Sequence, residues 1–259
     1  MEGGTEDGHS PSPTATNRRQ RARNGLLIVS FFLFPVTFYY LSPAISTFGA
    51  FQGVLTGAVL LFGLQFVSAL VLGRAWCGWV CPSGGMQEAC FRARDRRVVG
   101  GRWNWMKFFI WVPWLGNLIF TFARFGLKRV DPFFMTTYGF SLGSLPGIVT
   151  YVPILGLLVL LPALAIGRRA FCHYICWMAP FMIIGRSLGR VLRLPTLQMK
   201  ADSSKCASCG TCTRVCPMSL DVQPMVARRQ IRSSECINCG ACADNCPNHA
   251  IEFGFGPEK

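Results

Sequence analysis

Up to about residue 180, the chain alternates between long apolar stretches and short segments rich in arginine. A helix that crosses a bilayer needs ~20 largely apolar residues, and four stretches come close to that length, at residues 26–45, 54–72, 106–123 and 148–166. Pro35 and Pro113 fall inside two of them, which membrane helices tolerate where neighbouring groups satisfy the freed backbone. The pattern predicts an α-helical membrane domain of four transmembrane helices at residues 25–180.

The pattern differs at both ends of this domain. Residues 1–24 are polar and rich in Gly, Ser, Thr and Pro, which predicts a disordered N-terminal segment. Residues 181–199 contain Arg186, Arg190 and Arg193 at helical spacing opposite apolar residues. This pattern predicts an amphipathic helix on the membrane interface, followed by a linker. From residue 200 to 259 the composition is that of a small soluble domain, and we expect this domain to have an α+β fold.

Basic residues flank the apolar stretches unevenly. The formal net charge is +14, but Lys and Arg at the ends of apolar runs indicate membrane orientation rather than a nucleic-acid partner. Segments 18–23, 74–107 and 168–193 are rich in arginine, whereas the segment between the third and fourth stretches holds Arg124, Lys128 and Arg129. The positive-inside rule therefore predicts a multi-pass protein of the cytoplasmic (inner) membrane, with both termini in the cytoplasm.

The C-terminal domain contains one cysteine motif twice, CASCGTCTRVCP and CINCGACADNCP. Both copies have the C-x2-C-x2-C-x3-C-P spacing of two-cluster bacterial ferredoxins, in which the fourth cysteine of each run ligates the other cluster. Zinc usually takes two separate C-x2-C pairs, so this spacing fits zinc poorly. The motif predicts two [4Fe–4S] clusters: one is held by Cys206, Cys209, Cys212 and Cys246, and the other by Cys236, Cys239, Cys242 and Cys216.

A fainter repeat follows the second and the fourth apolar stretch, RAWCGWVC at residues 74–81 and RAFCHYIC at residues 169–176. Cysteines four residues apart share one face of a helix. Two such pairs could supply four thiolates to a third iron–sulfur cluster or to another metal. Buried small hydrophobes or a redox-active dithiol are the alternatives. The candidate ligands are Cys77, Cys81, Cys172 and Cys176.

Three further features have simpler explanations beside the functional ones. His173, inside the second copy, could ligate a metal, exchange a proton with a quinol, or simply pack. Cys90 is interpreted as a structural thiol. Trp76, Trp79, Trp103 and Trp105 are interpreted as a membrane-interface belt, and His9 as a bystander.

Taken together, these motifs resemble the NapH and MauN type of membrane-bound 4Fe–4S ferredoxins, and also the membrane core of the NosR and CcoG/FixG proteins. The resemblance covers about residues 25–252. Cys77, Cys81 and Pro82 match the C-x3-C-P motif of that family, whereas Trp177 replaces the proline after Cys176. The resemblance implies electron relay between the quinone pool and a redox partner protein, with a quinone as a further cofactor and with quinol dehydrogenase activity.

We therefore expect an electron-transfer subunit of a membrane oxidoreductase complex, in contact with the lipid bilayer and with redox partner proteins. No nucleotide-binding fingerprint is present in the sequence, which argues against direct reaction with NADH. Two alternatives stay open. One is a metal-handling membrane reductase similar to a cupric reductase, with copper at the C-x3-C pairs, and the other is a membrane anchor for a soluble oxidoreductase. The sequence assigns no catalytic residue.

Overall fold

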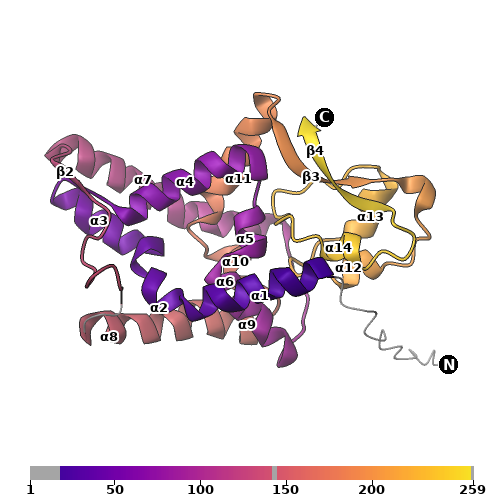
Figure 1. The fold of residues 1–259 in the computed structure, drawn as a ribbon, viewed down its shortest axis with the longest axis horizontal. Helices are drawn as coiled ribbons and strands as arrows, with labels where there is room; N and C mark the ends of the chain where they lie inside the picture. Colours follow the sequence, from indigo (N-terminus) through magenta and orange to yellow (C-terminus); the bar gives the residue numbers. More distant parts are fainter. Residues whose placement is uncertain (1–17, 142–144, 258–259) are drawn as a thin grey trace.

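The computed structural model describes residues 18–141 and 145–257. His9 and most of the predicted disordered N-terminal segment lie outside these residues. Figure 1 shows an elongated molecule with a layer of helices at one end and a smaller part, made of short helices and the strands β3 and β4, at the other. The helical end contains residues up to about 191, and the smaller end contains the two ferredoxin-type cysteine runs.

The first predicted span is not one helix. Its residues form α1 (Arg18–Phe32), α2 (Phe34–Thr37), a 3₁₀ turn and α3 (Pro43–Phe51). Pro35 and Pro43 stand in the first turns of α2 and α3. A proline has no backbone N–H to continue a preceding helix and suits the start of a new one. The prediction of a continuous helix over residues 26–45 is therefore wrong.

The second and third apolar stretches form the straight helices α4 (Gly57–Leu72) and α7 (Met106–Phe125). A 3₁₀ turn precedes α7. Among the described residues, the helical segment 101–125 is the one that is long and apolar enough, by length and composition, to cross a membrane. The helix α4 is apolar but shorter. The strands β1 (Val54–Thr56) and β2 (Arg129–Asp131) pair in parallel beside these helices.

The fourth stretch forms α8 (Leu145–Pro153), a π-helical segment at residues 154–160 and α9 (Leu161–Ala165). Pro162 cannot donate a hydrogen bond to the carbonyl four residues earlier, and π turns are one way in which a helix adapts to such a gap. The segment 154–165 is apolar but short of a spanning length. Four transmembrane helices thus stay a prediction, with α7 as the helix that meets the requirement.

Four shorter helices carry or flank the C-x3-C motifs: α5 (Ala75–Trp79), α6 (Pro82–Ala89), α10 (Ala170–Tyr174) and α11 (Ala179–Val191). The helix α11 packs tightly on α4 through Gly185 and Gly189. A Cβ atom on these glycines would lie 2.6 Å from the carbonyl oxygen of Phe66 and 2.3 Å from that of Leu70. The helix predicted at the start of residues 181–199 is present as α11, whereas the predicted linker is wrong because residues 195–201 form the strand β3. The placement of this helix on a membrane interface stays a prediction.

The C-terminal part is closed by an antiparallel pair, β3 (Pro195–Ala201) and β4 (Ile251–Pro257), in which Ala201 lies opposite Ile251. Between the strands lie α12 (Thr211–Arg214), α13 (Val222–Ala227) and α14 (Ala241–Asp244). Gly210 and Gly240 precede α12 and α14 with φ of 70° and 75°, a left-handed conformation that favours glycine. The domain thus begins a few residues before the predicted boundary at residue 200.

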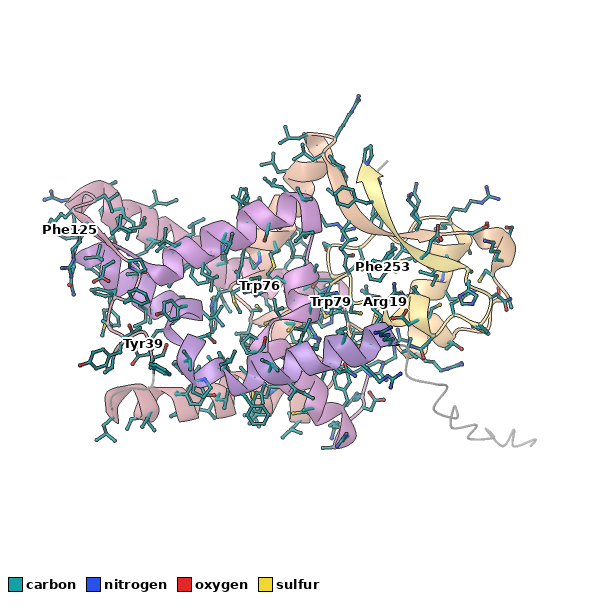
Figure 2. All side chains as sticks on the ribbon, in the orientation of Figure 1. Arg19, Tyr39, Trp76, Trp79, Phe125 and Phe253 are labelled. Atoms are coloured by element: carbon teal, nitrogen blue, oxygen red, sulfur yellow. The ribbon has the colours of Figure 1, made fainter. Side chains whose placement is uncertain are left out.

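The start of α1 joins the two ends of the molecule. Arg19 forms an ion pair with Asp244 and stacks on the ring of Phe253, 4.5 Å from its centroid; Arg19 and Phe253 are labelled at this contact in Figure 2. The amide Nε2 of Gln20 donates to the carbonyl of Cys239 at 3.0 Å. Residues 18–24 are helical and partly buried, so the prediction of disorder over residues 1–24 is wrong for them.

Candidate metal centres

The outer set of cysteines, Cys206, Cys209, Cys212 and Cys246, lines one cavity of the C-terminal domain. Three of them come from the first run, where the left-handed Gly210 turns the chain into α12, and the fourth comes from the second run. Val226 and Ile251 complete the apolar wall. The structure thus brings together the four side chains that the crossed ferredoxin pattern pairs.

The inner set, Cys216, Cys236, Cys239 and Cys242, lines a second cavity. Here the second run supplies three cysteines and the first run supplies Cys216, so the pairing is the mirror of the outer set. Burial raises the pKa of the Cys216 thiol to about 12. A buried cysteine of this kind becomes a thiolate when a metal binds it, because the metal charge outweighs the loss of solvation.

Both sets suit a cluster better than a single ion. Zinc holds its cysteine sulfurs about 2.3 Å from one point. Across the described residues, no three His, Cys, Asp or Glu side chains gather closely enough to hold one metal ion. A [4Fe–4S] cube spreads its four thiolates over the corners of a larger body. Four cysteines around a shared cavity, without a single-ion site, therefore fit the cube.

The two sets differ in their surroundings. In the outer set Cys209 is exposed, and hydrogen bonds from Thr211 lower the pKa of its thiol. In the inner set Cys239 is buried beneath the helical part. The indole Nε1 of Trp79 donates to the carbonyl of Asn238 at 3.0 Å, and a Cβ on Gly78 would lie 2.3 Å from the carbonyl oxygen of Ile237. The first C-x3-C motif thus lies directly against the inner set.

The four remaining candidates, Cys77, Cys81, Cys172 and Cys176, form what we call the C-x3-C set. All four are buried, with 3–4% of each residue exposed. Burial, and then the charges of the other three cysteines, raise the pKa of the Cys81 thiol. The two copies of the repeat meet directly, because the Nη1 of Arg169 in the second copy donates to the carbonyl of Cys77 in the first at 2.8 Å. The pKa of Cys176 is raised to about 12, again mainly by burial.

Two fully buried arginines flank the C-x3-C set. The Nη1 of Arg74 donates to Glu235 Oε2 at 2.9 Å and to the carbonyl of Ser234 at 2.7 Å. The Nη1 of Arg169 donates to the carbonyl of Cys77 at 2.8 Å and its Nη2 donates to Glu88 Oε1 at 2.5 Å. No role was predicted for them, although the repeat places an arginine at the same position in both copies.

The donor groups around the C-x3-C set fit an anionic cluster. The Nε and Nη2 groups of Arg74 and the Nε of Arg169 are buried and have no hydrogen-bond partner among the described residues. The Nε2 of Gln87 lies 3.2 Å from the Sγ of Cys172. The sulfur atoms of a cluster accept hydrogen bonds of this kind, which tune its potential. Four cysteines and these unused donors are what such a group needs.

His173 is held away from a ligand role. Its Nδ1 lies 3.0 Å from Asn104 Oδ1, and its Nε2 lies 3.1 Å from the carbonyl oxygen of Met218. Both ring nitrogens thus lie within hydrogen-bond distance of another group, and burial lowers the pKa of the ring to about 4. The histidine ties the second C-x3-C motif to the chain beside the inner set, which agrees with the packing role among the three that were considered.

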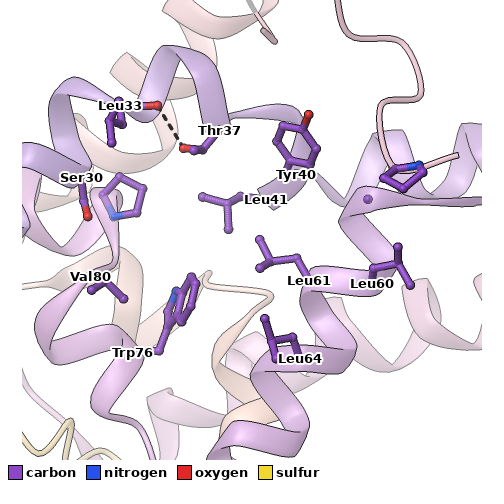
Figure 3. A pocket seen from close by; sticks show the side chains of 13 residues that line it. Ser30, Leu33, Thr37, Tyr40, Leu41, Leu60, Leu61, Leu64, Trp76 and Val80 are labelled. Atoms are coloured by element: carbon purple, nitrogen blue, oxygen red, sulfur yellow. Dashed lines mark hydrogen bonds between the residues drawn. The ribbon is translucent and has the colours of Figure 1, made fainter. Parts of the chain in front are cut away.

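The tryptophans have different environments. Trp103 and Trp105 are 52% and 63% exposed, as expected for an interface belt. The indole of Trp79 contacts the ferredoxin-type domain instead, so its assignment to a belt is wrong. Trp76 faces a cavity of about 500 Å³ between α1, α4 and α5, and Figure 3 shows it to the left of Leu61 and Leu64. Its buried Nε1 has no hydrogen-bond partner in the described part of the chain.

Comparisons with known proteins agree with these sites. A model described as a 4Fe–4S binding domain matches residues 54–103 and 149–195, which contain both C-x3-C motifs. A model described as a 4Fe–4S dicluster domain matches residues 198–247, which contain both ferredoxin-type runs. The first match covers the segments in which a third centre was expected. No solved structure matches the chain.

Three relatives carry names that describe an electron transport protein or a ferredoxin-type protein. The chain is 26% identical to the putative electron transport protein YccM of Escherichia coli K12 over 71% of this chain and 52% of that protein. It is 29% identical to the methylamine utilization ferredoxin-type protein MauN of Methylorubrum extorquens, over 67% and 60%. It is 30% identical to MauN of Paracoccus denitrificans, over 63% and 54%. The matched regions thus span about half to two thirds of these relatives. The chain thus carries two regions typical of 4Fe–4S proteins and is similar to the MauN-type ferredoxin proteins.

Proposed function

We propose that the protein is a membrane-bound relay that passes electrons between the quinone pool and a redox partner through three [4Fe–4S] clusters. The observation that carries the proposal is the order of the cysteine sets. The C-x3-C set lies at the inner face of the helical part, the inner set lies against it, and the outer set ends at the exposed Cys209. Clusters of this type take up and release one electron each.

Direct contacts support the step between the C-x3-C set and the inner set. Gly78, which follows Cys77, leaves room for the backbone of Ile237 and Cys239. The charge of Arg169 interacts with Cys172 and Cys81 and also with Cys239 of the inner set. No bulky side chain separates Gly78 from the loop that carries the inner cysteines. A short path of this kind suits electron transfer between two centres.

The outer surface of the helices supports the membrane part of the proposal. On α7, Val112, Ile119 and Phe120 are 57%, 61% and 69% exposed, and on α4 Leu64 and Val67 are 56% and 58% exposed. Apolar surface this extensive is typical of a membrane or protein contact. We infer that these faces lie in lipid, with four segments crossing the inner membrane and the arginine-rich loop at residues 92–102 on the cytoplasmic side.

The cavity of Figure 3 supports a place for the quinone. Its lining is almost entirely apolar, and Trp76 and Val80 stand next to Cys77 and Cys81 in the chain. The unused indole N–H of Trp76 would bind a carbonyl oxygen there. The proposed quinone would thus lie beside the C-x3-C set, at the start of the relay.

An iron count tests the proposal. Protein purified without oxygen should contain about twelve irons and as many acid-labile sulfides per chain if three [4Fe–4S] clusters are present. The double variant Cys77→Ser/Cys172→Ser should retain about eight and lose reduction by a soluble quinol. A count of about eight in both proteins would refute the third cluster and leave a two-cluster ferredoxin whose membrane cysteines are plain thiols.

A further inference from the structure

Arg74 and Arg169 occupy equivalent positions, each three residues before the first cysteine of its C-x3-C motif. Neither guanidinium is exposed to solvent. Burying a charge is costly unless hydrogen bonds and opposite charges compensate for the lost water. Each arginine has one carboxylate partner, Glu235 for Arg74 and Glu88 for Arg169. Whether the charge of each arginine is fully compensated therefore depends on what else its carboxylate binds.

The carboxylates are shared, so the pairs are not electrically balanced. Glu235 also binds the buried Nζ of Lys107 at 2.6 Å, and Glu88 also accepts from the buried Arg23. Within these two ion-pair groups, four cations thus face two carboxylates. The surplus positive charge lies beside the C-x3-C set and is a reason to expect an anion there.

The unused donors point to the same place. The Nε and Nη2 groups of Arg74 and the Nε of Arg169 have no partner in the described chain. Arg74 interacts electrostatically with Cys77 of its own motif and with Cys176 of the other. Arg169 interacts with Cys172 of its own motif and with Cys81 of the other. Arg169 also contacts the other copy directly, since its Nη1 donates to the carbonyl of Cys77 at 2.8 Å.

The space for one guanidinium is built into the fold. A Cβ on Gly84 would lie 3.0 Å from the Nη1 and 3.1 Å from the Nη2 of Arg169. That glycine lies in α6, which also carries Glu88 and Gln87. The helix thus supplies the carboxylate and the room for Arg169, and it supplies a donor to Cys172. Packing of this kind fixes the guanidinium in one orientation.

We propose that Arg74 and Arg169 donate N–H groups to a [4Fe–4S] cluster on the C-x3-C set from two sides and thereby raise its reduction potential. A reduced cluster carries more negative charge than an oxidised one, and nearby cations and hydrogen bonds favour the reduced form. The inference rests on the proposed third cluster. It assigns the two arginines as positioning and tuning residues rather than as simple partners of Glu88 and Glu235.

The test compares Arg169→Gln/Glu88→Gln with Glu88→Gln alone, in the full-length protein in detergent without oxygen. The double variant removes Arg169 together with its carboxylate, and both variants leave Arg23 without Glu88, so the comparison isolates the contribution of Arg169. The readouts are the iron count and a redox titration followed by electron paramagnetic resonance. We expect about twelve irons in both variants. One midpoint potential should be lower in the double variant than in Glu88→Gln, and the two ferredoxin-domain potentials should not move.

Three outcomes would overturn the inference. Unchanged potentials with about twelve irons would mean that Arg169 is only structural. An equal shift of all three potentials would mean a general change of charge. About eight irons in the wild type would refute the third cluster itself. If the double variant does not fold, Arg169→Lys and Arg74→Lys replace it, because they keep the charge but lose the guanidinium donors. They should give smaller shifts in the same direction, while Arg92→Gln on the exposed loop should give none.

Discussion

Replacing Gly78 by alanine should push the first C-x3-C motif away from the inner cysteine set. The added Cβ would lie 2.3 Å from the carbonyl oxygen of Ile237 and 3.4 Å from the Cα of Cys239. The first distance is far inside van der Waals contact, and both atoms belong to the backbone, so one segment has to move. The change adds one methyl group where two parts of the molecule meet.

The size of the effect follows from two opposing contributions. Overpacking a well-packed site typically costs about 1–3 kcal/mol. Alanine in place of glycine within a helix is by itself favourable by roughly 0.5–1 kcal/mol. Gly63, in α4, is the matched control, because a Cβ there meets nothing within 4 Å. We expect Gly78→Ala to be less stable than Gly63→Ala by about 1–3 kcal/mol.

Two assays separate packing from function. Thermal unfolding in detergent compares the stabilities of the two variants. Rapid mixing of the oxidised protein with a soluble quinol, followed by absorbance at the cluster bands, compares electron flow into the ferredoxin-type domain. Gly78→Ala should slow this reduction while the iron count stays the same. Equal melting temperatures and equal rates in Gly78→Ala and Gly63→Ala would refute the close approach and the route drawn through it.

Three further changes test other contacts. Glu235→Ala leaves Arg74 and Lys107 buried without their carboxylate, so we expect a loss of about 3–5 kcal/mol, measured by thermal unfolding; an effect no larger than that of the exposed Glu252→Ala would contradict it. Gly189→Leu should separate α11 from α4 and lower the melting temperature, since its side chain meets the backbone of Leu70; an unchanged melting temperature would refute the close packing. Limited oxidation by air should destroy the outer cluster first, because Cys209 is exposed and Cys239 is buried; loss of the inner cluster first, seen by electron paramagnetic resonance, would contradict the order of the sets.

The ferredoxin-type domain could be predicted in detail because its spacing is local. Eight cysteines in two short runs, each followed by proline, allow few arrangements. The structure groups them in two sets of four, each with three cysteines from one run and one from the other. The meeting of the two C-x3-C motifs was also predictable, since the repeat of RAWC and RAFC suggested two facing copies. In both cases, residues that act together are close in the sequence or repeat a pattern.

The helices were harder to predict because hydropathy averages over prolines. The stretch at residues 26–45 has the composition of a span, yet Pro35 and Pro43 divide it into shorter helices. Pro113 also falls within a stretch, but α7 continues through it to Phe125. Whether a proline ends a helix depends on what neighbouring groups offer the freed carbonyls. That information lies in tertiary contacts and not in the composition of the stretch.

Arginine was misread for a related reason. The positive-inside rule treats every Arg as a charge at the membrane surface, and most arginines of residues 92–102 are indeed exposed. Arg23, Arg74 and Arg169 are buried, however: Arg74 connects the first C-x3-C motif to the ferredoxin-type domain through Glu235, and Arg23 and Arg169 meet at Glu88 within the helical part. A surface cation needs no partner, whereas a buried one must be compensated. The acidic residues that do so are therefore the sequence signal to look for: in a chain with only 12 acidic residues, Glu88 lies in the helix after the first C-x3-C motif and Glu235 directly precedes a cluster cysteine.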